Sequence, residues 1–182
     1  MRVFGLIGKS LSHSFSKQYF EEKFRREGIV DAQYLNFELG SIAELDHVLR
    51  DPELRGFNVT IPYKQVILDR LSDMGPIAVE VGAVNTVVIT NGKLKGYNTD
   101  VYGFRQSLKP FLKPQHQRAL VLGSGGASNA VRFVLRRLGI DYLTVSRDPK
   151  GEYELDYPAL NAHVIRSHPF IINTTPLGMY PN

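Results

Sequence analysis

The sequence predicts an α/β protein of two domains, 1–114 and 115–182, with a mixed sheet in the first. Short apolar runs alternate with amphipathic stretches along the 182 residues, as is typical of strands and helices around a parallel sheet. Asn91-Gly92 lies between two strand-like runs and indicates a hairpin, which adds antiparallel strands. The polar segment Lys113–Gln117 is typical of a linker and places the domain boundary in or just before it.

Composition restricts the possible classes of protein. The chain is 43% hydrophobic and 22% charged, which is ordinary for a folded domain, and it contains no cysteine, which excludes disulfides and thiol nucleophiles. The formal charge is +4, but the basic residues are scattered, so we expect no nucleic-acid partner. A run of about 18 apolar residues is absent, so we expect no membrane partner and a cytoplasmic location. We also predict no metal site.

Local signals predict the elements of the first domain. Phe20 and Phe24 lie one turn apart on an amphipathic helix, Ser41 and Glu44 form a capping-box pattern, and Pro62 suits the first turn of a helix. The expected elements are strands over 3–7, 34–39 and 56–60, apolar hairpin runs over 83–90 and 93–97 at an antiparallel edge, and helices over 17–27, 41–50, from Pro62 to about Leu71, and from Val101 to the residue before Pro110.

The second domain begins with a strand, a glycine-rich turn and a helix. Gly123, Gly125 and Gly126 follow an apolar run, and the helix start after them offers unpaired N–H groups to an anion. This pattern predicts a Rossmann-type dinucleotide-binding unit. Further strands are expected over 142–146 and 170–173, with at most a short helix over 156–162. Three strands make one mononucleotide-binding half, so the Rossmann unit is partial.

Polar residues after the strands of the first domain suggest chemistry. Ser14 and Ser16 precede a helix, where hydroxyl groups favour a carboxylate or phosphate or simply cap the helix. Lys64 follows the carboxyl end of a strand, and Asp100 follows an Asn-Thr pair. A lysine paired with an aspartate, beside a nucleotide loop, can accept the hydroxyl proton when an alcohol is oxidised by hydride transfer.

Six separated motifs resemble the shikimate dehydrogenase family, and they occur in the order found in that family. They cover nearly the whole chain. They are Ser14-Phe-Ser16, Asn58-Val-Thr-Ile-Pro-Tyr-Lys64, Gly82-Ala-Val-Asn-Thr86, Asn98-Thr-Asp100, Gly123-Ser-Gly-Gly-Ala127 and Asn173-Thr-Thr-Pro-Leu-Gly178.

The resemblance implies an NADP-dependent, reversible reduction of 3-dehydroshikimate to shikimate. It implies that Ser14 and Ser16 hold the substrate carboxylate and that Lys64 and Asp100 form the catalytic pair. Asp100 also binds a ring hydroxyl in this interpretation. The other hydroxyl-binding residues implied are Thr60 and Asn85, although either side chain could instead only satisfy nearby backbone groups.

The cofactor residues follow from the same resemblance. Arg147, with Lys150 behind it, favours the 2′-phosphate of NADP over NAD. Three positions depart from the family pattern: Asp148 stands in place of a threonine, Ser146 in place of an asparagine and Lys17 in place of a proline. The carboxylate of Asp148 would be unfavourable beside a phosphate unless it points away. The expected cofactor residues are Gly123, Ser124, Gly125, Gly126, Ala127, Ser146, Arg147, Lys150 and Thr174.

Members of the family continue beyond the last motif into a second Rossmann half and a closing helix with a substrate-binding glutamine. We therefore expect a truncated chain or fragment. Two alternatives remain open: a quinate/shikimate dehydrogenase that uses NAD, and a nucleotide- or substrate-binding module without turnover. The sequence is compatible with a monomer or a homodimer.

Overall fold

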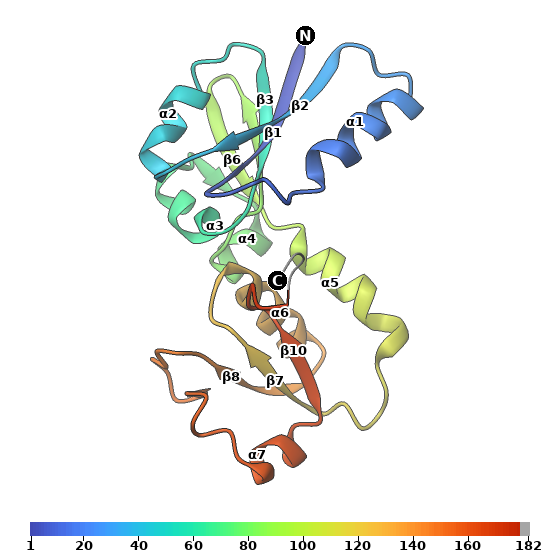
Figure 1. The fold of residues 1–182 in the computed structure, drawn as a ribbon, viewed down its shortest axis with the longest axis vertical. Coiled ribbons are helices and arrows are strands. Elements are labelled where there is room, and N and C mark those ends of the chain that lie inside the picture. The colour runs from blue at the N-terminus through green and yellow to red at the C-terminus, as the bar shows by residue number, and fades with distance from the viewer. Residues whose placement is uncertain (179–182) are drawn as a thin grey trace. The chain divides into compact units, whose positions relative to one another are not determined.

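The computed structural model describes residues 1–178, whose contacts form two compact units (Figure 1). The first unit is Met1–Asn98 and the second begins at Thr99. The helix that starts at Asp100 is thereby grouped with the second unit, whereas the sequence analysis placed it in the first domain. The domain boundary near residue 114 stays a prediction.

A sheet of six strands forms the first unit, and its mixed strand directions agree with the expectation from the sequence. β1 pairs in parallel with β2 and β3, and β5 is antiparallel to both β3 and β6. In the order β2-β1-β3-β5-β6-β4, the strands are β2 (Ala32–Glu38), β1 (Arg2–Gly8), β3 (Leu54–Val59), β5 (Thr86–Thr90), β6 (Lys93–Tyr97) and β4 (Asp73–Met74).

The predicted hairpin is confirmed, but its predicted position at the sheet edge is wrong. Asn91 and Gly92 have φ values of 51° and 72°, the positive values that a two-residue hairpin turn requires. The short strand β4 pairs with β6 on its outer side, and so it occupies the edge. With only two residues, β4 has no periodicity from which it could be predicted.

Helices cover both faces of this sheet (Figure 1). Leu6 and Tyr34 pack with Phe20 on one face, while Val3 and Ile7 belong to the core on the other. This alternation follows the two-residue period of a strand. The helices are α1 (Ser16–Arg26), α2 (Leu45–Val48) after the 3-10 turn Ile42–Glu44, α3 (Tyr63–Val66) followed by the 3-10 turn Ile67–Arg70, and α4 (Pro76–Val81). The Ser41–Glu44 capping box is present as predicted.

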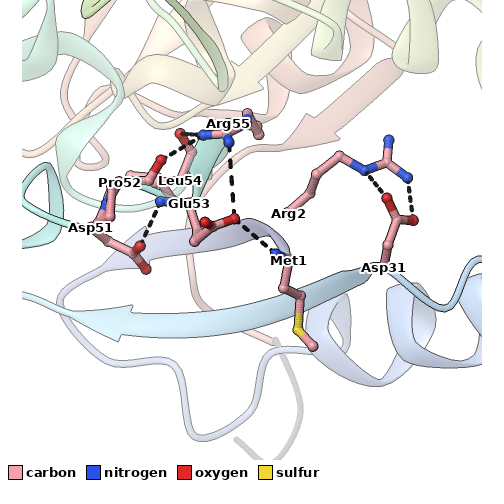
Figure 2. A network of polar contacts seen from close by, with 8 residues as sticks. All are labelled: Met1, Arg2, Asp31, Asp51, Pro52, Glu53, Leu54 and Arg55. Carbon is pink, nitrogen blue, oxygen red and sulfur yellow. Dashed lines mark hydrogen bonds and ion pairs between the residues drawn. The ribbon is translucent and has the colours of Figure 1, made fainter.

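Exposed ion pairs join the amino ends of β1, β2 and β3 (Figure 2). The amino group of Met1 lies 2.9 Å from Glu53, which also lies 3.9 Å from Arg55. Arg2 donates two hydrogen bonds to Asp31, at 3.0 and 2.7 Å, and these hold the pKa of that carboxyl below its ordinary value. Because exposed pairs are screened by water, we assign this network only a minor role in stability.

A parallel four-stranded sheet forms the second unit, consistent with a partial Rossmann-type fold. In the order β10-β7-β8-β9, the strands are β10 (Phe170–Asn173), β7 (Arg118–Leu122), β8 (Asp141–Val145) and β9 (Glu154–Leu155). The helices are α5 (Asp100–Leu108), followed by the 3-10 turn Lys109–Phe111, α6 (Gly126–Arg137) and α7 (Ala162–Ser167).

The expected short helix over 156–162 is wrong, because the helix begins where that stretch ends. The Asn161 side chain accepts hydrogen bonds from the backbone N–H groups of His163 and Val164, at 2.9 and 3.0 Å, and so caps α7. Upstream, Asp156 accepts a 2.9 Å bond from the Ala159 N–H, which stabilises a turn instead of a helix.

An apolar face of α6 packs on the second sheet. Val131 and Leu135 contact a core that includes Ala119 and Val121 of β7.

Among residues 1–178, no helix is long and apolar enough to cross a membrane.

Candidate active site

The candidate residues fall into two groups, one in each unit. In the first unit, the carboxyl ends of β1 and β3 and the start of β5 share one edge of the sheet, because β5 runs antiparallel to β3. Thr60 donates its N–H to the Ile7 carbonyl at 2.9 Å, and the Val59 N–H donates to the Asn85 carbonyl at 2.9 Å. The structure therefore brings Thr60 and Asn85 to the same edge.

Gly8 allows this close approach at the end of β1. A Cβ atom placed there would lie 2.6 Å from Cγ2 of Thr60 and 2.5 Å from a methyl group of Leu11. Only a residue without a side chain fits, so Thr60 and the loop that follows β1 can both lie against the strand end.

The loop between β1 and α1 presents Ser14 and Ser16 at the start of that helix. The Ser16 N–H donates to the Ser14 hydroxyl at 3.2 Å, and the Leu11 N–H donates to Glu38 of β2 at 2.6 Å, so the loop is tied to the sheet. The first turn of α1 contains no acidic residue, and the residue before the helix makes no side-chain cap. This helix start is therefore suited to an anionic group.

Lys64 lies on α3, just past the end of β3, and is half-buried. Its carbonyl accepts a 2.8 Å hydrogen bond from the Val84 N–H, directly before Asn85. The preceding residue, Tyr63, is buried and donates its hydroxyl to the Leu39 carbonyl. These contacts hold α3 at the same edge of the sheet as Asn85.

In the second unit, the carboxyl ends of β7, β8 and β10 meet at one edge. The Gly123 N–H donates to the Val145 carbonyl at 2.8 Å, and the Thr174 hydroxyl donates to the Leu122 carbonyl at 2.6 Å. Gly123 has φ +106°, and a Cβ there would lie 2.8 Å from Oγ1 of Thr174. The predicted cofactor residues after the three strands are thus brought together.

Several features of this edge fit a dinucleotide. A Cβ on Gly125 would meet no atom within 4 Å, so the space above the glycine loop is open, and the start of α6 carries no side-chain cap. Within the described chain, the buried hydroxyl of Ser146 has no hydrogen-bond partner. Unpaired helix N–H groups and a free hydroxyl beside an open glycine loop suit a phosphate-bearing ligand.

The two basic residues after β8, Arg147 and Lys150, differ in their contacts with Asp148. Arg147 is exposed. Lys150 is also exposed, but its Nζ lies 3.4 Å from Oδ2 of Asp148. The departure at Asp148 noted in the sequence therefore places a carboxylate against Lys150, which leaves Arg147 as the stronger candidate for a phosphate.

Asp100 is the first residue of α5 and belongs to the second unit, whereas Lys64 belongs to the first. Each is described within its own unit, and their pairing stays a prediction.

Among residues 1–178, no group of three or more His, Asp or Glu side chains could hold a metal ion.

Known proteins match both parts of the chain. Residues 6–87 match the family model of the shikimate dehydrogenase substrate binding domain. The whole chain aligns with the NADP(+) shikimate dehydrogenase of Pyrococcus abyssi, with 33% identity over 189 residues and coverage of 71% of that protein. The chain belongs to the shikimate dehydrogenase family.

Solved structures of the family support the fold of the entire chain. Shikimate dehydrogenase 1 from Peptoclostridium difficile superposes with a TM-score of 0.87 at 35% identity, covering 100% of this chain and 69% of that one. The Thermus thermophilus enzyme in complex with NADP(H) and shikimate has a TM-score of 0.75 at 29% identity, covering 97% of this chain and 69% of its own. The family resemblance seen in the six motifs and the α/β fold expected from the alternation of strands and helices are thus confirmed.

This member of the family contains a partly buried hydrogen-bond chain that the sequence analysis missed. The Tyr34 hydroxyl donates to Oδ1 of Asn58 at 2.7 Å, and Nδ2 of Asn58 donates to the Asn85 carbonyl at 3.3 Å and to the Thr86 hydroxyl at 3.2 Å. Burial raises the pKa of the Tyr34 phenol. The chain thus joins Tyr34 of β2 to the backbone of Asn85.

A signal for this chain was available in the sequence. A tyrosine on a strand that is expected to be buried needs a partner for its hydroxyl, and an asparagine within a strand needs partners for its amide. Neither requirement identifies the partner, because Tyr34 and Asn58 are 24 residues apart.

Replacing Tyr34 by phenylalanine should lower the free energy of unfolding by about 1–3 kcal/mol, because Oδ1 of Asn58 then loses its partner in a partly buried site. Urea unfolding measures the change. Tyr19→Phe removes an exposed hydroxyl from α1 and is the matched control, with an expected change within about 0.5 kcal/mol. Equal effects of the two substitutions would contradict a structural role for the Tyr34 hydroxyl.

Proposed function

We propose that this protein catalyses the NADP-dependent, reversible reduction of 3-dehydroshikimate to shikimate, with Lys64 and Asp100 as the catalytic pair. The observation that carries the proposal is that residues with hydroxyl, amide and ammonium side chains lie at one edge of the first sheet, in a chain of this family. The groups belong to Ser14, Ser16, Thr60, Lys64 and Asn85.

The substrate is a ring acid that carries several hydroxyl groups. Ser14 and Ser16 bind its carboxylate, since their hydroxyls lie at a helix start without acidic residues. Thr60 and Asn85 bind ring hydroxyls, because a hydroxyl or amide side chain can both donate and accept. The backbone bonds that fix these two residues also fix the orientation of the ring.

Proton transfer falls to Lys64. During oxidation its neutral amine accepts the proton of the reacting hydroxyl, and during reduction its ammonium returns the proton to the oxygen. Asp100 accepts a hydrogen bond from a ring hydroxyl of the substrate and stabilises the charged lysine. The chemistry supplied by bound NADP is hydride transfer.

Cofactor binding falls to the second unit. Gly123, Ser124, Gly125, Gly126 and Ala127 line the open loop at the start of α6, which suits a pyrophosphate. Ser146 and Thr174 flank it on the neighbouring strand ends, and Arg147, with Lys150, binds the 2′-phosphate. The ion pair with Asp148 weakens the part played by Lys150.

Initial rates of shikimate oxidation with NADP and NAD in parallel test the proposal. We expect turnover with NADP and much slower turnover with NAD, because Arg147 pairs with a phosphate that NAD lacks. Quinate serves as a second substrate in the same assay. Faster turnover with NAD and quinate would instead support the quinate/shikimate branch.

The chain spans about 70% of the length of the relatives named above, 71% for the Pyrococcus abyssi protein. A module that binds shikimate without turnover would retain the first-unit site alone. Saturable shikimate binding by calorimetry, with no reduction of either cofactor, would support that module against the enzyme.

A further inference from the structure

The loop that follows Ser146 carries the residue expected to choose between the two cofactors. Arg147 lies at its start, and the loop returns to the sheet at Glu154, the first residue of β9. The backbone bond from the Thr144 N–H to the Tyr153 carbonyl, 2.9 Å, closes its far end. The conformation of this loop therefore depends on the contacts that the residues between Arg147 and Tyr153 make.

Glu154 uses both carboxylate oxygens to hold this loop to α6. Oε2 accepts a 2.9 Å hydrogen bond from the Lys150 N–H, and Oε1 lies 3.5 Å from Nη1 of Arg132 on α6. The side chains of Arg132 and Glu154 are only 23% and 17% exposed, so water screens this ion pair less than it screens the surface pairs. The carboxylate is thus a bridge from the helix to the loop backbone.

Two further contacts fix the same turn. The Glu154 N–H donates to the Gly151 carbonyl at 3.0 Å, and a Cβ on Gly151 would lie 3.7 Å from Cγ of Glu154. Arg132 in turn donates to the Asn129 side chain on its own helix, which orients the guanidinium. Glu154 therefore holds the backbone of Lys150 and packs beside Gly151, in the loop that starts at Arg147.

We propose that Glu154 is a positioning residue for the NADP 2′-phosphate: bridged to Arg132, it holds the 147–151 backbone in the shape that places Arg147 for the phosphate. This inference rests on the proposed NADP dependence. It assigns the nucleotide preference partly to a carboxylate that does not itself touch the nucleotide.

The direction in which phosphate binding changes when Glu154 is replaced distinguishes a positioning role from a purely electrostatic one. A carboxylate near a phosphate repels it, so removing the charge of Glu154 should strengthen binding if charge alone mattered. If Glu154 positions the loop, removing its charge weakens binding, because the ion pair with Arg132 is lost. Glu154→Asp keeps the charge but shortens the side chain, and it should weaken binding for the same reason.

Calorimetric titrations of the 182-residue protein with adenosine 2′,5′-bisphosphate and with 5′-AMP test this directly, since the two probes differ only in the 2′-phosphate. We expect the parent protein to prefer the bisphosphate. In Glu154→Gln and in Glu154→Asp, the ratio of bisphosphate affinity to 5′-AMP affinity should fall about tenfold, which corresponds to the loss of one charge-assisted hydrogen bond. The affinity for 5′-AMP itself should stay unchanged. Glu152→Gln removes the same charge from an exposed residue of the loop and should keep or increase the preference.

Any other outcome would overturn either the NADP assignment or the positioning role of Glu154. A parent protein that does not distinguish the two probes overturns the NADP assignment, and the role of Glu154 with it. A parent preference that survives in both Glu154 variants overturns the positioning role alone. Equal weakening of both probes also overturns it, because that result assigns Glu154 a purely structural role.

Discussion

Replacing Lys64 by alanine is expected to lower kcat for shikimate oxidation by about 100- to 10,000-fold, the range typical of a lost general acid or base. KM should change far less, because the ring is held by Ser14, Ser16, Thr60 and Asn85, and the lysine acts chiefly on the proton that moves in the transition state. Initial rates of NADP reduction over a range of shikimate concentrations separate the two constants.

Lys93→Ala is the matched control for this substitution, since it removes an exposed lysine at the start of β6. It should leave both constants unchanged. A Lys64→Ala protein in which KM rises while kcat stays near the parent value would show that Lys64 only binds substrate, and the catalytic assignment would be wrong.

Replacing Gly123 by alanine is expected to lower the free energy of unfolding by about 1–3 kcal/mol, because an L side chain is strained at φ +106°. The new Cβ would also lie 2.8 Å from Oγ1 of Thr174 and 3.1 Å from Cγ2 of Thr175, so the loop after β10 must move. Urea unfolding measures the loss, and NADP affinity should fall with it.

Gly125→Ala provides the contrast within the same loop. Gly125 has φ −82°, and its Cβ would meet no protein atom, so the loss of stability should be clearly smaller than for Gly123→Ala. NADP affinity should nevertheless fall, because the methyl group occupies space proposed for the pyrophosphate. Unchanged NADP affinity in Gly125→Ala would contradict the proposed place of the nucleotide on this loop.

Parallel pairing made much of the candidate site predictable. Because β1 and β3 are parallel, the serine loop and Lys64 follow strand ends at the same edge, and β7 and β8 do the same for Gly123 and Ser146. The hairpin turn at Asn91-Gly92 has a local signal that few other dipeptides give. These features depend on short stretches of sequence and on the direction of strands.

Long-range contacts between side chains were not predictable in the same way. Asn58 connects to the Asn85 carbonyl across 27 residues, and Arg132 of α6 pairs with Glu154 of β9, although the whole of β8 lies between them in the sequence. Nothing local in either pair indicates its partner. The start of α7 was misplaced because the cap at Asn161 outweighed the weak helical pattern before it.

We propose above all that shikimate binds at the edge of the first sheet formed by the carboxyl ends of β1 and β3 and the start of β5. Titration with shikimate, followed by backbone amide chemical shifts, tests this binding site most directly. We predict saturable shifts centred on Ser14, Ser16, Thr60 and Asn85, and a marked loss of affinity in Ser16→Ala but not in Ser12→Ala, which alters an exposed serine of the same loop. The absence of saturable shifts, or shifts confined to residues after Thr99, would contradict the claim.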